Sequence, residues 1–168
     1  MLYPTLNKVE ELLKEYQMVP VFYEVLADYM TPIRMFQALR KEGTPCFMLE
    51  SVENKDQWGR YSFIGINPKS EIKISGKELE VDGVKQEEEF KMSYLSDLIK
   101  KYKSPVMEDY PKLTGGLIGY FGYDMIRQVE KKLTNVPEDD LKMPECHLCM
   151  YDLSLIHISE PTRLLSIS

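Results

Sequence analysis

Apolar side chains recur every three or four residues in three parts of the chain, a spacing typical of amphipathic helices. The segments that show this spacing are residues 9–16, 31–43 and 94–102. On a helix it gathers the apolar side chains on one face, which can then pack against a sheet. We therefore predict three helices in these segments.

The first two of these segments also carry signals for a helix end. Asn7 lies three residues before Glu10, as in a capping box. Thr31 and Pro32 supply an N-cap and a first helical position, and Gly43 stands where a C-terminal cap is expected. The first helix should therefore begin at Asn7, and the second should run from Pro32 to Gly43.

Most of the other apolar residues alternate with polar ones, which is the period-two pattern of β-strands. Gly76 and Gly83 separate such runs in the middle of the chain, so we predict a β-meander from Pro45 onward. Strands are expected at residues 19–27, 46–52, 60–66, 71–75, 78–84, 113–124 and 145–152, with a short helix at 125–131.

Closely spaced glycines interrupt the strand predicted at residues 113–124. Gly116, Gly119 and Gly122 invite comparison with a phosphate-binding loop, but the chain contains neither G-x-G-x-x-G nor G-x-x-x-x-G-K-[ST]. Glycine inside a strand also permits a neighbouring backbone to approach closely. We therefore expect a buried strand whose glycines face an adjacent backbone.

Length and charge limit the classes of protein that the chain can represent. Its 168 residues suit one ordinary domain, and 43% hydrophobic with 29% charged residues is typical of soluble proteins. The net charge of −6 argues against a nucleic-acid partner, because phosphate binding requires clustered Lys and Arg. Small molecules or other proteins are the expected partners.

The sequence also gives an expectation for the cellular location. No apolar run approaches the roughly 18 residues of a membrane span, and the N-terminal residues lack the pattern of a signal peptide. The odd number of cysteines, three, fits a reducing compartment better than a disulfide framework. A cytoplasmic protein without membrane contact is therefore expected.

Two cysteines have the C-x-x-C spacing of half a zinc site. Cys146 and Cys149 enclose His147, but a closed zinc site takes four ligands, and only Cys46 and His157 could complete the set. Residues three apart on a strand also point to opposite faces of a sheet. We therefore expect buried structural cysteines and no metal site.

The remaining charged and nucleophilic residues do not form a recognisable catalytic motif. The acidic runs at residues 87–89 and 138–140 are contiguous, a pattern that usually coats a solvated loop. No nucleophile elbow, zinc-binding helix or Ser-His-Asp set can be assembled. We therefore predict no catalytic residues in this chain.

Residues 47–65, FMLESVENKDQWGRYSFIG, place polar residues where two strands should form a core. A free amino acid as ligand needs an acceptor for its ammonium group, donors for its carboxylate and an apolar slot for its side chain. Strand alternation puts Leu49 and Ser51 on one face and Glu50 on the other. An ion pair between Glu50 and Arg60 across the two strands explains the same residues equally well.

The segment Leu153 to Arg163, LSLIHISEPTR, can be back-translated into a DNA sequence that resembles a transposase adapter. We therefore expect residues 1–152 to be the natural sequence and residues 153–168 to be a non-native read-through tail.

Three motifs in order resemble anthranilate synthase component I. The stretch at residues 47–65 is similar to the L-L-E-S and G-R-Y-S-F-I-G signature of that family, with Met48 in place of the first leucine. Residues 19–39, VPVFYEVLADYMTPIRMFQAL, and the run that begins TGGLIGYFGYDMIRQVE at Thr114 resemble the same family. The resemblance covers residues from about 3 to 152.

The resemblance implies a fold and an allosteric site. The fold is the α+β fold of chorismate-utilising enzymes, an antiparallel β-sandwich with outer helices, of which this chain would be an incomplete N-terminal part. The L-L-E-S segment of the family helps to form a pocket for tryptophan as feedback inhibitor. The residues that this role would pass to are Leu49, Glu50 and Ser51, with Arg60, Tyr61 and Ser62 as adjoining candidates.

The resemblance also implies an activity for the intact protein. The family's enzyme is a lyase that converts chorismate, with ammonia or glutamine, into anthranilate and pyruvate. It uses Mg²⁺ and a glutamine amidotransferase subunit, component II. The chorismate and metal residues of the family lie in its C-terminal portion, so we expect this chain alone to bind no cofactor and to be inactive.

Two alternatives remain open. Aminodeoxychorismate synthase component I, from folate synthesis, is a close relative in which a similar tryptophan pocket can be structural. A stand-alone amino-acid-binding module would instead require the chain to end naturally near Asp152.

Overall fold

The computed structural model describes residues 2–24, 30–50, 61–107, 113–130, 132–135, 138–152 and 154–158. The chain divides into two compact units, each built from two separate stretches of sequence. The first unit comprises Met1–Leu26 and Ser70–Met150, and the second comprises Ala27–Lys69 and Tyr151–Ser168.

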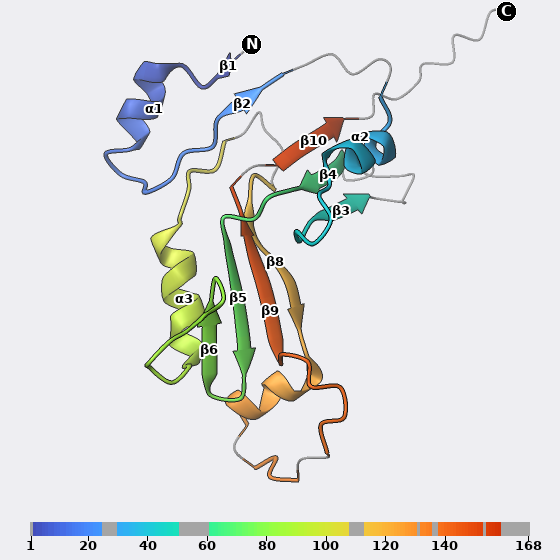
Figure 1. Ribbon diagram of the computed structural model, residues 1–168. Coiled ribbons are helices and arrows are strands. Elements are labelled where there is room, and N and C mark those ends of the chain that lie inside the picture. The colour runs from blue at the N-terminus through green and yellow to red at the C-terminus, as the bar shows by residue number, and fades with distance from the viewer. Residues whose placement is uncertain are drawn as a thin grey trace, which may run out of the picture. The chain divides into compact units, whose positions relative to one another are not determined.

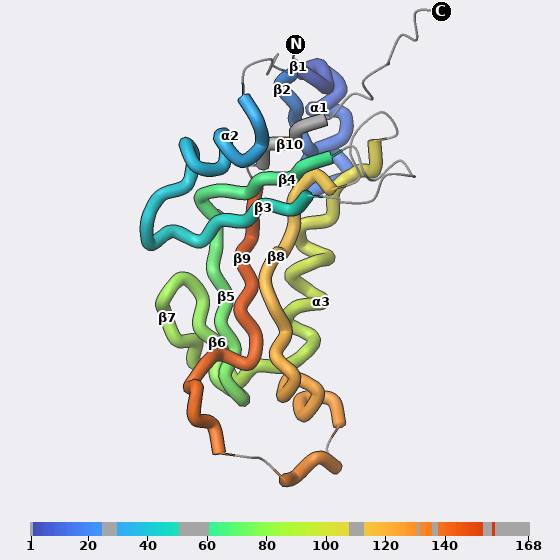
Figure 2. Tube along the Cα trace, turned by 90° about the vertical axis from the view of Figure 1, so that its right-hand side faces the viewer, coloured from blue at the N-terminus to red at the C-terminus, as the bar shows by residue number. Residues whose placement is uncertain are grey.

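A five-stranded sheet forms the centre of the first unit, with the strand order β7-β6-β5-β9-β8. Figure 1 labels four of these strands, and Figure 2 labels all five. Its strands are β5 (Ser70–Ser75), β6 (Glu78–Val81), β7 (Val84–Lys85), β8 (Gly116–Phe121) and β9 (Cys146–Tyr151). The unit also contains helices α1 (Leu6–Leu12) and α3 (Met92–Lys101), the 3-10 helix η1 (Tyr123–Gln128), and a pair of two-residue strands, β1 (Leu2–Tyr3) and β2 (Phe22–Tyr23).

The antiparallel pairing of β5 with β9 sets the core of this unit. Ile72 lies opposite Leu148, and Ile74 lies opposite Cys146, so four apolar side chains share one face of the sheet. Helix α3 runs along this sheet (Figure 2), and its Leu95 is buried in the same cluster. The other buried members of the cluster are Leu79, Phe90 and Met125. The apolar faces of helix α3 and of strands β5 and β9 therefore pack together in one layer.

The edge strand β8 approaches its neighbour β9 very closely at one glycine. A Cβ atom added to Gly119 would overlap the carbonyl oxygen of His147 and lie 2.9 Å from the Cα atom of Leu148. Gly122 makes a similar approach, since its N–H donates to the carbonyl of Glu145 at 2.6 Å. The predicted close backbone approach is confirmed at both positions.

Gly116 differs from these two glycines, and the predicted burial of the strand is wrong. An added Cβ at Gly116 would meet nothing within 4 Å, but its φ of +138° is one that other residues rarely adopt. Strand β8 lies at the edge of the sheet, and none of its residues is fully buried. An edge strand has only one neighbouring strand to cover it, which explains the difference.

The second unit contains a three-stranded antiparallel sheet and one helix. Its strand order is β10-β4-β3, with β3 at Phe47–Glu50, β4 at Tyr61–Gly65 and β10 at Ser154–Ile158. Helix α2 (Pro32–Leu39) contacts β4 and buries Met35. Strand β10 lies within the segment expected to be a read-through tail, and the origin of that segment stays a prediction.

Helices α2 and α3 occur where the apolar spacing predicts them, whereas α1 ends at Leu12, four residues before the end of its predicted segment, and two of the end signals are wrong. Thr31 caps α2 as expected, since its hydroxyl accepts a hydrogen bond from the N–H of Arg34 at 3.3 Å. Helix α1 already includes Asn7, and its N-cap residue Thr5 makes no side-chain hydrogen bond. Helix α2 ends at Leu39, so Gly43, with φ of +75°, belongs to a separate turn.

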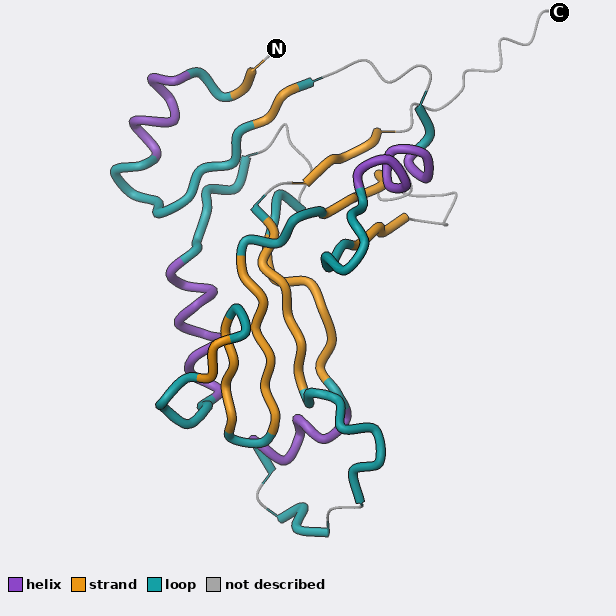
Figure 3. The backbone as a smooth tube through the Cα atoms, in the orientation of Figure 1, coloured by secondary structure: helices purple, strands orange, loops and turns teal. Residues whose placement is uncertain are grey.

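The predicted meander is wrong as a single sheet. Strands β3 and β4 pair with each other, whereas β5 pairs with β6 and with β9, which comes from much later in the chain. The first predicted strand is represented by Phe22–Tyr23, and residues 25–29 lie outside the described residues. The predicted helix at 125–131 occurs as η1 at Tyr123–Gln128, and the described parts of the connection from η1 to β9 are loop (Figure 3).

The fold thus mixes helices with antiparallel strands, as predicted. The finer expectation that its sheets form a β-sandwich stays a prediction. Within the described residues, no helix has the length and apolar character needed to cross a membrane.

The close approach at Gly119 can be tested by Gly119→Ala. Because backbone atoms rather than a flexible side chain would have to move, we expect the free energy of unfolding to fall by about 3 kcal/mol, the upper end of the usual cost of overpacking. Urea unfolding followed by circular dichroism measures this.

The matched control is Gly83→Ala in the turn between β6 and β7. Gly83 has φ of +78° and open space around it, so its replacement should cost only about 1 kcal/mol of backbone strain. Equal costs at the two positions would contradict the close packing of β8 on β9.

Candidate functional site

The stretch singled out in the sequence forms the antiparallel pair β3 and β4. Leu49 lies opposite Phe63, and Glu50 lies opposite Ser62. Residues 51–60 lie outside the described residues, so the structure gives no position for Ser51 or Arg60, and the binding roles of all six candidates stay predictions. Four of the six candidates, Leu49, Glu50, Tyr61 and Ser62, can therefore be placed.

One face of this strand pair carries the polar candidates. The hydroxyl of Ser62 donates to Glu50 Oε1 at 3.4 Å, at the long end of the hydrogen-bond range. Ser62 is 7% exposed, and it shares this face with the fully buried Ile64, two residues along β4. The alternative ion pair between Glu50 and Arg60 stays a prediction.

The opposite face is aromatic and partly open. Leu49 is 46% exposed, and it lies on the face that also carries Tyr61 and Phe63, whose ring centroids are 5.9 Å apart. Phe47 lies on the same face at the start of β3, and its ring packs edge-on against Tyr151 at 4.9 Å. An exposed leucine beside several aromatic rings offers apolar surface to a ligand.

Phe47 also lies directly over Gly65, the residue opposite it on β4. A Cβ added to Gly65 would overlap the ring of Phe47, so glycine is needed here for the aromatic side chain to fold down onto the strand. The final glycine of the sequence motif therefore has a packing role.

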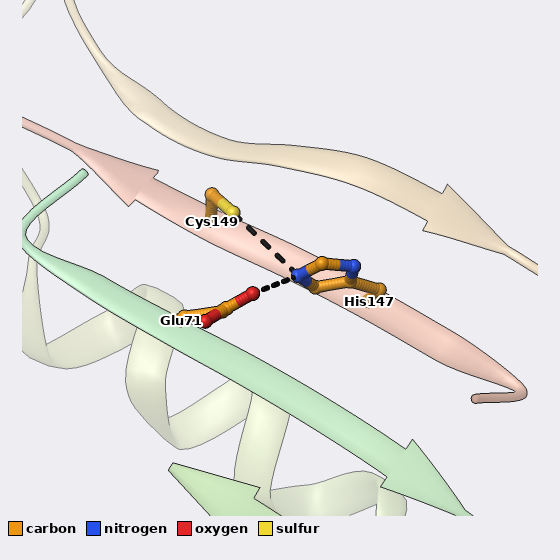
Figure 4. A group of neighbouring side chains, drawn as sticks. All are labelled: Glu71, His147 and Cys149. Carbon is orange, nitrogen blue, oxygen red and sulfur yellow. Dashed lines mark hydrogen bonds and ion pairs between the residues drawn. The ribbon is translucent and has the colours of Figure 1, made fainter. Parts of the chain in front are cut away.

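A second group of polar side chains, the Glu71–His147–Cys149 cluster, lies on the first unit's sheet, on the face opposite its core. Glu71 lies directly opposite Cys149, and Lys73 lies directly opposite His147. His147 Nε2 lies 2.7 Å from Glu71 Oε1 and 3.8 Å from Cys149 Sγ (Figure 4). The three ligand atoms all lie within 4.8 Å of one another.

The charges around this cluster are arranged to keep Glu71 ionised. Burial raises the pKa of the Glu71 carboxyl, but hydrogen bonds and attraction from Lys73 and His147 outweigh it, so the pKa is lowered. The hydrogen bond to Glu71 in turn raises the pKa of Lys73, against a smaller effect of burial. The ammonium of Lys73 lies 3.2 Å from Glu71 Oε1 and 3.8 Å from Glu80.

Cys146 and Cys149 do point to opposite faces, as the strand argument predicts. Cys146 is fully buried in the core, where burial raises the pKa of its thiol to about 11. Cys149 is 5% exposed and lies in the polar cluster. The prediction that both are buried cysteines is confirmed, but the cluster around Cys149 was not foreseen.

Part of this cluster could have been found from the sequence. His147 and Cys149 are two residues apart, so on a strand they share one face. The third member, Glu71, comes from a strand 76 residues earlier, and only the pairing of β5 with β9 brings it close. No pattern in the nearby sequence predicts the contact between Glu71 and His147.

Comparison with known proteins finds several relatives that carry the name anthranilate synthase. Anthranilate synthase component 1 from Acetivibrio thermocellus is 41% identical over 167 residues, covering 94% of this chain and 32% of the relative. The protein of the same name from Pseudomonas aeruginosa is 32% identical over 147 residues, covering 84% and 30%. Anthranilate synthase alpha subunit 2, chloroplastic, from Arabidopsis thaliana is 34% identical over 172 residues, covering 89% and 28%. No protein-family model matches the chain.

One solved structure, anthranilate synthase component I from Streptococcus pneumoniae TIGR4, matches with a TM-score of 0.49 and 25% identity. The match covers 88% of this chain and 33% of that chain.

These relatives share one name, anthranilate synthase. The chain is homologous to anthranilate synthase component I, and the resemblance seen in its three motifs is confirmed. It spans about a third of the length of the curated relatives it matches.

The exposure of Leu49 predicts that this side chain contributes little to stability. Leu49→Ala should lower the free energy of unfolding by less than about 1 kcal/mol, since exposed positions are tolerant. Ile64→Ala, at a fully buried position of the neighbouring strand, should cost about 2–5 kcal/mol. Urea unfolding of both variants measures this, and similar costs would show that Leu49 is a core residue rather than part of an open surface.

Proposed function

We propose that this chain is the N-terminal part of anthranilate synthase component I. The intact protein would convert chorismate, with ammonia or glutamine, into anthranilate and pyruvate. The observation that carries the proposal is the 41% identity over 94% of the chain to a relative of that name. Three motifs in the family's order add to it.

Within this enzyme, the β3 and β4 pair would form part of a regulatory site for tryptophan. An indole ring is large, flat and apolar, and the face formed by Leu49, Tyr61 and Phe63 suits it. Ser51 would extend the same face by strand alternation and offer a hydroxyl to the amino-acid end of the ligand. Binding there would couple the end product to the activity of the intact enzyme.

Glu50 takes a different part in this proposal, because its side chain lies on the opposite face with Ser62. Its hydrogen bond to the buried Ser62 would hold β3 in register with β4. Strand β3 is also the last strand of its sheet within the described residues. Its outer backbone groups are therefore candidates for binding the ammonium or carboxylate of the ligand.

The chemistry itself would come from the rest of the intact enzyme. The resemblance gives no residue of this chain a place in chorismate binding, catalysis or Mg²⁺ coordination, so all three are assigned to the remaining part of the protein. A component II amidotransferase subunit would supply ammonia from glutamine. This chain alone should therefore show no turnover.

Two other functions remain candidates. An aminodeoxychorismate synthase would use the same substrates but make a different product, and the names of the relatives favour anthranilate synthase. A stand-alone amino-acid-binding module would bind tryptophan without any associated activity. Fluorescence of anthranilate formed from chorismate and ammonia by the intact enzyme distinguishes an anthranilate synthase from an aminodeoxychorismate synthase.

The regulatory proposal predicts the behaviour of Ser51→Ala and Leu49→Ala in the intact enzyme. Each should raise the tryptophan concentration for half-inhibition by roughly 3- to 10-fold, because each removes one hydrogen bond or one apolar contact worth about 1 kcal/mol. Activity without tryptophan should stay within about twofold of the unmodified enzyme, since neither residue is placed in the reaction. Initial rates of anthranilate formation at a series of tryptophan concentrations measure both quantities.

A matched control is Leu141→Ala, which removes the same atoms at a position that is 73% exposed in the first unit. Its inhibition by tryptophan should be unchanged. Unaltered inhibition in both Ser51→Ala and Leu49→Ala would overturn the regulatory site while leaving the assignment of the reaction intact.

A further inference from the structure

The Glu71–His147–Cys149 cluster brings together three side chains of different ligand chemistry. A carboxylate, an imidazole nitrogen and a thiol sulfur converge within 4.8 Å, and they come from two adjacent strands. The side chains of His147 and Glu71 are 26% and 29% exposed, whereas Cys149 lies deeper at 5%. An ion could therefore enter from solvent between His147 and Glu71 and reach the sulfur.

The arrangement is unsuited to nucleophilic catalysis. In a Cys-His-carboxylate triad, one ring nitrogen serves the nucleophile and the other is held by the carboxylate. Here the same atom, His147 Nε2, faces both Glu71 and Cys149 (Figure 4). A nitrogen that donates its proton to Glu71 cannot also accept the proton of Cys149.

Binding of a metal ion would account for an arrangement in which His147 Nε2 faces both Glu71 and Cys149. All three groups then act as electron-pair donors to one ion. We propose that Glu71, His147 and Cys149 bind Zn²⁺ or a chemically similar divalent ion, with water as the fourth ligand. Thiolate and imidazole favour zinc among the common divalent ions, and three protein ligands with one open position are a known zinc arrangement. The two anionic ligands balance the charge of the ion.

The two distances from His147 require only small adjustments, and the ligand atoms of Glu71 and Cys149 lie within 4.8 Å of each other. Zinc bonds of about 2.0 Å to nitrogen and 2.3 Å to sulfur put these atoms about 3.5 Å apart in a tetrahedron, close to the 3.8 Å found between His147 and Cys149. The 2.7 Å between His147 and Glu71 would have to widen by roughly 0.7 Å to reach tetrahedral spacing. Glu71 is partly exposed, so its carboxylate can rotate by this amount.

Two neighbouring side chains, Tyr120 and Lys73, affect the proposed metal site. Tyr120 on β8 packs edge-on against the His147 ring at 6.0 Å, and its hydroxyl donates to the carbonyl of Pro144, so the imidazole is held on one side. Lys73 competes with an ion for Glu71, but it also lies 3.8 Å from Glu80 and can keep that partner. Removing the charge of Lys73 should therefore strengthen metal binding.

The test is binding of Zn²⁺ and Co²⁺ to the 168-residue chain, with Zn²⁺ affinity measured by competition with a chromogenic chelator. One equivalent of Co²⁺ should give a sulfur-to-cobalt charge-transfer band and the strong visible bands of four-coordinate cobalt. Cys149→Ser should remove the charge-transfer band. His147→Gln and Glu71→Gln should weaken Zn²⁺ binding at least about 100-fold, beyond the 10- to 100-fold typical of outer-shell partners.

The controls separate a metal site from a hydrogen-bonded cluster. Cys46→Ser removes a thiol of the other unit and should leave the cobalt spectrum unchanged. Lys73→Gln should tighten Zn²⁺ binding several-fold, which a purely structural cluster would not show. If Cys149→Ser fails to fold by circular dichroism, the partly exposed His147 and Glu71 variants carry the comparison. A cobalt complex without the charge-transfer band, or Zn²⁺ affinity equal in the original chain and His147→Gln, would overturn the proposal.

Discussion

The antiparallel pairing of β5 with β9 is the constraint on which the first unit depends. It places Ile72 opposite Leu148 on the face covered by α3, and it places Glu71 opposite Cys149 on the other face. A slip of one residue would turn every side chain of one strand to the wrong face. The apolar core and the polar cluster are therefore two consequences of one register.

Local patterns predicted the elements of this fold better than their arrangement. Helices α2 and α3 and most strands occur where apolar spacing places them, because that spacing reflects the face each element buries. The apolar pattern did not predict that the expected meander divides into two sheets, because β5 pairs with β9, which lies about 75 residues later in the chain. The capping prediction at Asn7 failed because Thr5 already precedes the helix, and it caps α1 without a side-chain bond.

The two candidate sites differ in how much of each could be predicted from the sequence. Resemblance identified the β3 and β4 pair, and alternation correctly separated Leu49 from Glu50, which bonds to Ser62 instead of facing the aromatic surface. For the second cluster, sequence offered only the two-residue spacing of His147 and Cys149. The carboxylate that completes it depends on strand pairing, which is set by the whole sheet rather than by nearby residues.

The register of β5 on β9 can be measured directly by nuclear Overhauser effects between backbone protons in the isotopically labelled chain. The structure predicts cross-strand contacts that link Ile72 with Leu148 and Ile74 with Cys146. Hα–Hα or HN–HN contacts that instead link Ile72 with His147 or Cys149 would mean a slipped register. That result would contradict both the core and the polar cluster described for this unit.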